Sequence, residues 1–148
     1  MSAEPELAPT TRVASYALVE DESRRLLLVR IAPGYPAAGK WTLPGGGLNF
    51  GEDPALGVLR ELGEETGLTG EVIDLAFVHS YVRGALPNHG LGAYHAIRIV
   101  YRVRITGGGL RDEIEESTDR AAWFALDEAR ALPLVDLAVT ALDHLALD

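Results

Sequence analysis

The chain has 148 residues, of which 47% are hydrophobic and 24% are charged, and its formal net charge is −9 at pH 7. This composition is typical of a soluble globular domain, and no apolar run approaches the length of a membrane-spanning helix. The acid excess argues against a nucleic-acid partner, and the absence of cysteine excludes a disulfide framework, a thiolate zinc site and a cysteine nucleophile. We therefore expect a cytoplasmic protein without a membrane partner.

The N-terminal part of the chain begins irregularly and then turns to strand. Residues 1–10 contain two prolines and no hydrophobic periodicity, which indicates a flexible tail before a single domain over residues 11–148. Residues 13–19 and 26–31 are predicted strands joined by a polar turn, and the second is apolar enough to be central. After a loop rich in proline and glycine, residues 41–43 form a short predicted strand.

The strongest helix prediction covers residues 53–66. Asp53 is a natural N-cap, Pro54 suits the first helical position, and Gly67 supplies a C-terminal stop. Four apolar residues share one face at helical spacing, namely Ala55, Val58, Leu59 and Leu62. The helix is therefore expected to pack through this face.

The C-terminal half alternates irregularly between strands and helices. We predict strands over residues 72–81, 95–105 and 121–124, a helical turn over 127–132 and a last helix over 135–147. A loop with glycine and proline, residues 83–92, separates the first two of these strands. This order indicates an α/β (α+β) fold in which helices cover a mixed sheet.

The predicted helix carries three carboxylates at spacings of i, i+3 and i+4. They are Glu61, Glu64 and Glu65, and they lie on an arc next to the apolar face. Close carboxylates repel one another, whereas hard oxygen ligands of this kind hold Mg²⁺ or Mn²⁺ well. From these three residues alone, a solvated acidic surface is the alternative interpretation.

The residues around the glutamates resemble a known motif. Gly46, Glu52, Arg60-Glu61-Leu62, Glu64-Glu65 and Gly67-Leu68 reproduce the 23-residue Nudix box at every defining position. The chain thus resembles a Nudix hydrolase, and residues 41–45 and the late Trp123-Phe124 pair are also similar to this family. The resemblance implies an α/β/α sandwich around a central mixed sheet, with Mg²⁺ as the usual cofactor and Mn²⁺ as a substitute.

The resemblance also implies roles for the residues of the box. Glu61, Glu64 and Glu65 correspond to the metal ligands, and one of them would also orient or deprotonate the attacking water. Arg60 is similar to the box arginine that holds a glutamate in place and counts with them as catalytic. Glu52 and Gly67 correspond to supporting and structural positions.

Residues outside the box complete the expected site. In this family a further carboxylate often joins the metal ligands, and Glu113, Glu115 and Glu116 are candidates, of which we favour Glu116. We assign Arg30, Gly45 and Gly46 to substrate binding.

The resulting hypothesis is a Mg²⁺-dependent hydrolase of a nucleoside diphosphate derivative, in which water attacks phosphorus. The substrate would be a small nucleotide, and both an ADP-ribose-like nucleotide sugar and a nucleoside triphosphate stay open, because residues 81–87 match neither subgroup marker. The alternative is a nucleotide-sensing module of the same fold without catalysis. Many relatives pair as dimers, so a homodimer is one expected state.

Overall fold

The computed structural model describes residues 7–147. Residues 1–6 of the predicted tail lie outside the described residues, and Thr10 already begins the first strand. None of the helices in this part of the chain is long and apolar enough to cross a membrane.

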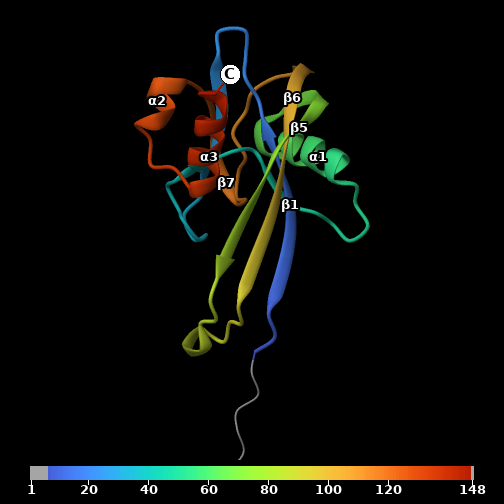
Figure 1. Cartoon of the computed structure of the whole chain (residues 1–148). Coiled ribbons are helices and arrows are strands. Elements are labelled where there is room, and N and C mark those ends of the chain that lie inside the picture. Colours follow the sequence, from blue (N-terminus) through green and yellow to red (C-terminus); the bar gives the residue numbers. More distant parts are fainter. Residues whose placement is uncertain (1–6, 148) are drawn as a thin grey trace, which may run out of the picture.

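Within residues 7–147, the fold consists of two sheets and three α-helices (Figure 1). One sheet has the order β4-β1-β6-β5, in which β1 runs parallel to β6 and the other neighbours are antiparallel; the second is antiparallel with the order β3-β2-β7. In chain order the elements are β1 (Thr10–Leu18), β2 (Arg25–Ile31), β3 (Trp41–Thr42), β4 (Gly45–Gly47), α1 (Pro54–Thr66), β5 (Leu68–Arg83), the 3₁₀ turn η1 (Pro87–His89), β6 (Tyr94–Gly108), β7 (Thr118–Ala125), α2 (Leu126–Arg130) and α3 (Asp136–Leu145).

The two faces of the sheets hold separate hydrophobic cores. At the end of β1, Ala17 and the following Val19 contribute to the core under α1, whereas Leu18 between them joins the core under α3. Such alternation follows from the two-residue period of a strand. The predicted α/β/α arrangement with a mixed sheet is therefore confirmed.

Helix α1 begins and ends where its sequence predicts. The Asp53 carboxylate accepts hydrogen bonds from the backbone N–H groups of Ala55, at 2.8 Å, and Leu56, at 3.4 Å. At the other end Gly67 adopts a left-handed conformation, φ 76°, and its N–H donates to the carbonyl of Gly63. These caps fix the position at which the glutamates of α1 meet the sheet.

The long strands differ from their predicted lengths. β5 and β6 extend to residues 68–83 and 94–108, with register shifts in their pairing. Together with β1 they run beyond the helices, and η1 lies at their far end (Figure 1). Because of this extension, residues of β1, β5 and β6 line one side of a cavity.

Candidate catalytic site

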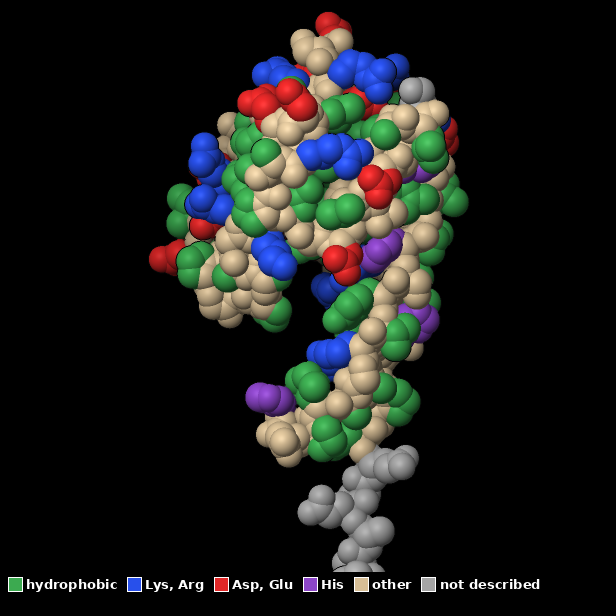
Figure 2. All heavy atoms as spheres, turned by 60° about the vertical axis from the view of Figure 1, so that its left-hand side comes forward, with side chains coloured by type: hydrophobic (Ala, Val, Ile, Leu, Met, Phe, Trp, Pro, Cys, Tyr) green, Lys and Arg blue, Asp and Glu red, His purple; other side chains and the backbone are tan. Residues whose placement is uncertain are grey.

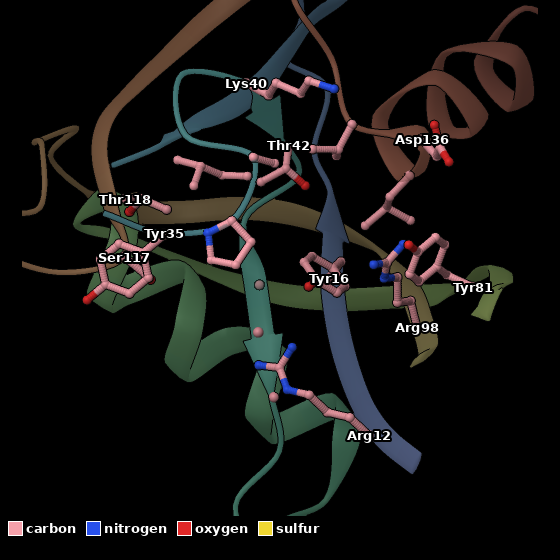
Figure 3. Close-up of a pocket in the computed structure, with 18 of the residues that line it drawn as sticks. Arg12, Tyr16, Tyr35, Lys40, Thr42, Tyr81, Arg98, Ser117, Thr118 and Asp136 are labelled. Atoms are coloured by element: carbon pink, nitrogen blue, oxygen red, sulfur yellow. The ribbon is translucent and has the colours of Figure 1, made fainter. Parts of the chain in front are cut away.

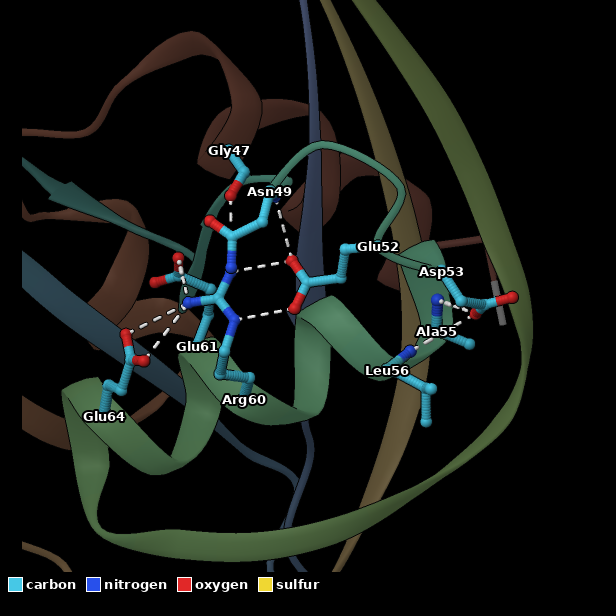
Figure 4. A network of polar contacts seen from close by, with 9 residues as sticks. All are labelled: Gly47, Asn49, Glu52, Asp53, Ala55, Leu56, Arg60, Glu61 and Glu64. Atoms are coloured by element: carbon cyan, nitrogen blue, oxygen red, sulfur yellow. Dashed lines mark hydrogen bonds and ion pairs between the residues drawn. The ribbon is translucent and has the colours of Figure 1, made fainter.

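Arg60 forms hydrogen bonds with acidic side chains just before α1 and within it (Figure 4). Its Nε and Nη2 atoms donate to the two carboxylate oxygens of Glu52, at 2.8 and 2.9 Å, and its Nη1 donates to Glu61 and Glu64, at 3.1 and 3.2 Å. The Arg60 guanidinium and the backbone N–H of Asn49 lower the pKa of Glu52 to about 2. The two hydrogen bonds between Glu52 and Arg60 therefore form an ion pair at neutral pH.

Glu65 lies in a different environment from its two neighbours. The residue is only 3% exposed, and its Oε1 accepts a hydrogen bond from the backbone N–H of Gly45 at 3.1 Å. Its Oε2 is buried and has no hydrogen-bond partner among the described residues. Burial, followed by the negative charge of Glu61, raises the pKa of Glu65 well above its ordinary value. A buried oxygen of this kind is suited to a cation.

The glycines of β4 allow the glutamates to approach the sheet. A Cβ on Gly46 would lie 2.9 Å from Oε1 of Glu61, which is closer than side chains pack. Gly45 has φ +154°, and a Cβ there would meet the carbonyl oxygen of Ser15 at 2.3 Å. These three glycines pair with β1 as the edge strand of the sheet. The missing side chains leave the room that Glu61 occupies.

The segment after β6 closes over the C-terminal end of α1. The Arg111 side chain donates to the carbonyl of Gly63 at 3.2 Å, and its backbone N–H donates to that of Thr66 at 2.9 Å. A Cβ on Gly67 would lie 2.4 Å from the carbonyl oxygen of Gly109, so glycine is required at this close approach. The chain is thereby held against α1 just before the acidic residues that follow.

Among those residues, Glu113 is half-buried and interacts electrostatically with Glu61 and Glu64 of α1. Its carboxylate accepts a hydrogen bond from Oγ1 of Thr118 at 3.0 Å. Burial raises the pKa of Glu113, and the negative charges of Glu116, Glu61 and Glu64 raise it further. The Glu116 side chain, which we favoured from the sequence, is exposed.

A cavity of about 700 Å³ opens beside the glutamates (Figure 3). Glu61, Glu65 and the three β4 glycines form part of its lining. The long strands contribute Arg12, Tyr16, Tyr81, Arg83, Tyr94 and Arg98, and the opposite side includes Tyr35 and Lys40. Basic and aromatic side chains therefore surround the space next to the carboxylates.

The structure brings together most of the residues selected from the sequence, with two exceptions. Glu61, Glu65, Gly45 and Gly46 line the cavity, whereas the Glu64 side chain is 51% exposed and pairs with Arg60. Arg30 does not line the cavity; its Nε and Nη2 donate to the Asp119 carboxylate, at 2.9 and 3.2 Å. Arg30 and Glu116 neither line the cavity nor form a hydrogen bond with a residue of α1 in the described part of the chain.

The basic residues of the long strands are not among those predicted from the sequence. Arg98 lines the cavity beside Tyr81 (Figure 3). Arg12 was not selected at all, although it lies two residues from Ala14 and four from Tyr16 on the same face of β1. The two-residue period of a strand predicts that Arg12 and Tyr16 share a face, but it does not predict that this face lines a cavity.

Two of the glutamates have the chemistry that a divalent cation needs. Over residues 7–147, no three acidic or histidine side chains are arranged together as ligands, and Arg60 donates hydrogen bonds to both Glu61 and Glu64. The unpartnered Oε2 of Glu65, beside Glu61, nevertheless provides a hard oxygen donor. Glu61 and Glu65 are therefore the residues that could hold a divalent cation, with Glu64 one turn of helix from Glu61.

A family model and two similar proteins identify the family. The family model described as NUDIX domain matches residues 10–145. A MutT-like protein of Streptomyces ambofaciens is 31% identical over 137 residues, which cover 93% of this chain and 79% of the relative. A putative nudix hydrolase 1 of Caenorhabditis elegans is 32% identical over 120 residues, covering 74% of this chain but only 30% of that longer protein.

A solved structure extends the likeness to the whole fold. The crystal structure of a MutT NUDIX hydrolase from Burkholderia pseudomallei superposes with a TM-score of 0.77 at 29% identity. The aligned region covers 91% of this chain and 98% of that one.

Proposed function

This chain belongs to the NUDIX hydrolase family, and we propose that it hydrolyses the diphosphate linkage of a small nucleotide with Mg²⁺ as cofactor. The observation that carries this proposal is the buried Oε2 of Glu65, which has no partner within the described chain and lies beside Glu61 at the edge of the cavity. An acidic protein can accept such an anionic substrate because a cation would lie between the glutamates and the phosphates.

In this proposal the residues of α1 have two roles, cation binding and the positioning of the cation ligands. Glu61, Glu64 and Glu65 hold the cation, and one of them orients or deprotonates the attacking water. Bound Mg²⁺ supplies charge neutralisation at the phosphate oxygens and a lower pKa for its water. Arg60 is a positioning residue, because its guanidinium fixes Glu61 and Glu64 on one side and is itself anchored by Glu52.

We assign Glu113, in place of Glu116, as the further carboxylate. Its partial burial beside Thr118 and its electrostatic interaction with Glu61 and Glu64 support this choice. The hydrogen bond from Thr118 orients the Glu113 carboxylate. Glu116 is exposed and stays outside the proposed ligand set.

Hydrolysis of nucleotide sugars, dinucleotides and nucleoside triphosphates, measured with Mg²⁺ and then with EDTA, tests the proposal. We expect turnover with Mg²⁺, its loss on chelation, and a decrease of several orders of magnitude in Glu64→Gln and Glu65→Gln. Glu22→Gln is a matched control, because Glu22 is exposed and does not line this cavity. Undiminished turnover in EDTA or in the two variants would overturn the site assignment.

The alternative function, nucleotide sensing without catalysis, predicts tight binding with no product in the same assay. All three box glutamates are present, which favours the hydrolase. The cysteine-free composition agrees with a cytoplasmic location, which we propose together with the function. A homodimer stays a prediction, and light scattering would test it.

A further inference from the structure

Basic side chains without counter-ions are concentrated in the cavity. The chain has 13 Lys and Arg residues, and seven of them form ion pairs with carboxylates: Arg24, Arg25, Arg30, Arg60, Arg102, Arg104 and Arg130. For the other six, residues 7–147 supply no carboxylate oxygen within 4 Å, and four of these six line the cavity. In a protein of net charge −9, leaving these cations unpaired around one space indicates a site for an anion.

Outside α1, the unpaired cations outnumber the acidic residues among the described residues that line the cavity. The four cations are Arg12, Lys40, Arg83 and Arg98, and the only acidic lining residue outside α1 in the described chain is Asp136. Figure 2 shows basic side chains in the hollow between the body of the molecule and the long strands. A cation held by the glutamates would therefore leave most of this positive charge without compensation.

Arg12 and Arg98 lie on neighbouring strands around Tyr16. In the β1–β6 pairing Arg12 stands opposite Ala96 and Ala14 stands opposite Arg98, so both arginines belong to one face. Both guanidinium charges act to lower the pKa of Tyr16, against the larger effect of burial. Arg12 also reaches the carboxylate end, because a Cβ on Gly47 would lie 2.7 Å from its Nη2.

The contacts of Arg98 orient it without neutralising its charge. Its Cζ lies 5.4 Å from the centre of the Tyr81 ring, and its Nη1 is 3.3 Å from Nδ1 of His79. Burial and the charge of Arg98 lower the pKa of His79, so this imidazole is neutral at pH 7. In the same way Arg83 lies 5.3 Å from the Tyr94 ring. Because arginines cover both tyrosine rings, this wall is better suited to an anionic group than to a stacked base.

We propose that Arg12 and Arg98 are specificity residues that bind a third phosphate, so that the enzyme prefers nucleoside triphosphates to ADP-ribose-like nucleotide sugars. This inference rests on the proposed function of the glutamate site. At neutral pH a nucleoside triphosphate carries roughly four negative charges and ADP-ribose roughly two, since only a terminal phosphate ionises twice. Two guanidinium groups can donate several charged hydrogen bonds to the added phosphate.

ATP and ADP-ribose are matched probes, because they share adenosine and a diphosphate. We expect wild-type kcat/KM to favour ATP by at least about tenfold, the usual effect of one hydrogen bond to a charged group. Arg12→Gln and Arg98→Gln should each lower kcat/KM for ATP by about tenfold to a hundredfold while changing the value for ADP-ribose much less. Arg98→Lys, which keeps the charge, should recover part of the loss.

Arg120→Gln is the control, because Arg120 also lacks an ion pair in the described chain but stacks on Trp41, 5.9 Å from the ring centre, outside the cavity. It should leave the ratio of the two kcat/KM values unchanged. A wild-type preference for ADP-ribose, or an equal loss with both nucleotides in the Arg12 and Arg98 variants, would overturn the inference.

Equilibrium binding of ATP and ADP-ribose in EDTA separates this inference from the proposed function, because it requires no turnover. If no nucleotide is hydrolysed but ATP binds more tightly than ADP-ribose and loses this advantage in Arg98→Gln, the function fails and the specificity assignment stands. If hydrolysis depends on Mg²⁺ but the two nucleotides bind equally, or neither binds, the specificity assignment alone is wrong.

Discussion

Glu65 Oε1 accepts a hydrogen bond from the backbone N–H of Gly45 at 3.1 Å, and this contact anchors the catalytic helix to the edge of the sheet. It uses only one of the two carboxylate oxygens, since Oε2 is buried without a partner in residues 7–147. In the metal-free fold an ionised Glu65 would be a buried negative charge next to Glu61. Such a charge destabilises the fold unless a cation or a proton neutralises it.

Glu65→Gln should stabilise the metal-free protein at pH 7 while abolishing activity. Burial and Glu61 raise the pKa of Glu65, so its ionised form opposes folding at every pH above the unfolded value of about 4.3. Glutamine keeps an acceptor for the Gly45 N–H and removes the charge. In thermal unfolding with EDTA, Tm should rise by about 2–4 °C for each kcal/mol of repulsion relieved, and the gain should vanish below about pH 4.

Mg²⁺ should reverse this ranking. Binding only to the folded state stabilises it, by about 2.7 kcal/mol at a hundred times Kd, so the wild type should gain Tm with Mg²⁺ and Glu65→Gln should not. Glu64→Gln is the matched control in EDTA, because Glu64 is half exposed and offers little repulsion to relieve. A metal-free Glu65→Gln protein that is no more stable than Glu64→Gln would contradict the role of burial.

Glu52→Gln should destabilise the protein at pH 7 but not near pH 2. The pKa of Glu52 in the folded state is about 2, below the unfolded value of about 4.3, so the ionised form stabilises the fold through Arg60 and the Asn49 N–H. This contribution is complete above about pH 5 and is lost as the pH falls towards 2. Urea unfolding of both proteins from pH 7 to pH 2 measures it; a difference that stays constant with pH would argue against the ion pair.

The sequence predicts the catalytic helix closely because its signals are local. Asp53, Pro54 and Gly67 cap the helix through contacts within a few residues, and the structure confirms each role. The apolar face was also found, since Val58 and Leu62 are fully buried. The sequence does not distinguish Glu65 from Glu61 and Glu64, because its buried position depends on a hydrogen bond from Gly45, twenty residues away in the chain.

Non-local features could not be derived in this way. The strand β4 consists of three glycines, which have low strand propensity, and it forms because β1 supplies the pairing groups. Likewise, Arg98 lies beside the catalytic centre only through the parallel pairing of β1 with β6. Long-range pairing of this kind leaves no spacing signal in the sequence.

Glu113→Gln should lower kcat by about tenfold or more, whereas Glu116→Gln should change it less than about twofold. The Gln side chain still accepts the hydrogen bond from Thr118, so the loss would come from the missing charge near the α1 glutamates. Steady-state kinetics at saturating Mg²⁺ would check the ranking, with Tm measured to exclude unfolding. A larger loss in Glu116→Gln would return the assignment to that residue.

Gly46→Ala should inactivate the enzyme without unfolding it. The added Cβ would lie 2.9 Å from Oε1 of Glu61, and the carboxylate must move because it is the flexible partner. We expect kcat to fall by at least about tenfold, as displacement of a catalytic group by about 1 Å commonly does, while Tm changes by a few degrees. Gly84→Ala is the control, since a Cβ there meets nothing within 4 Å. Full activity in Gly46→Ala would show that Glu61 does not need its present position.

Two alanine substitutions inside α1 should have opposite effects on stability. Replacing a helical glycine with alanine usually gains about 0.5–1 kcal/mol, and at Gly63 the new Cβ would meet only the Leu68 carbonyl at 3.8 Å, an ordinary contact. At Gly57 it would lie 2.6 Å from Cδ2 of Leu48 and 3.1 Å from Oε1 of Glu52. Overpacking costs about 1–3 kcal/mol, and here it also disturbs the carboxylate that anchors Arg60, so Gly57→Ala should lose both stability and activity. Denaturant unfolding of both variants decides the sign, and a stabilised Gly57→Ala would mean that Leu48 yields without effect on the site.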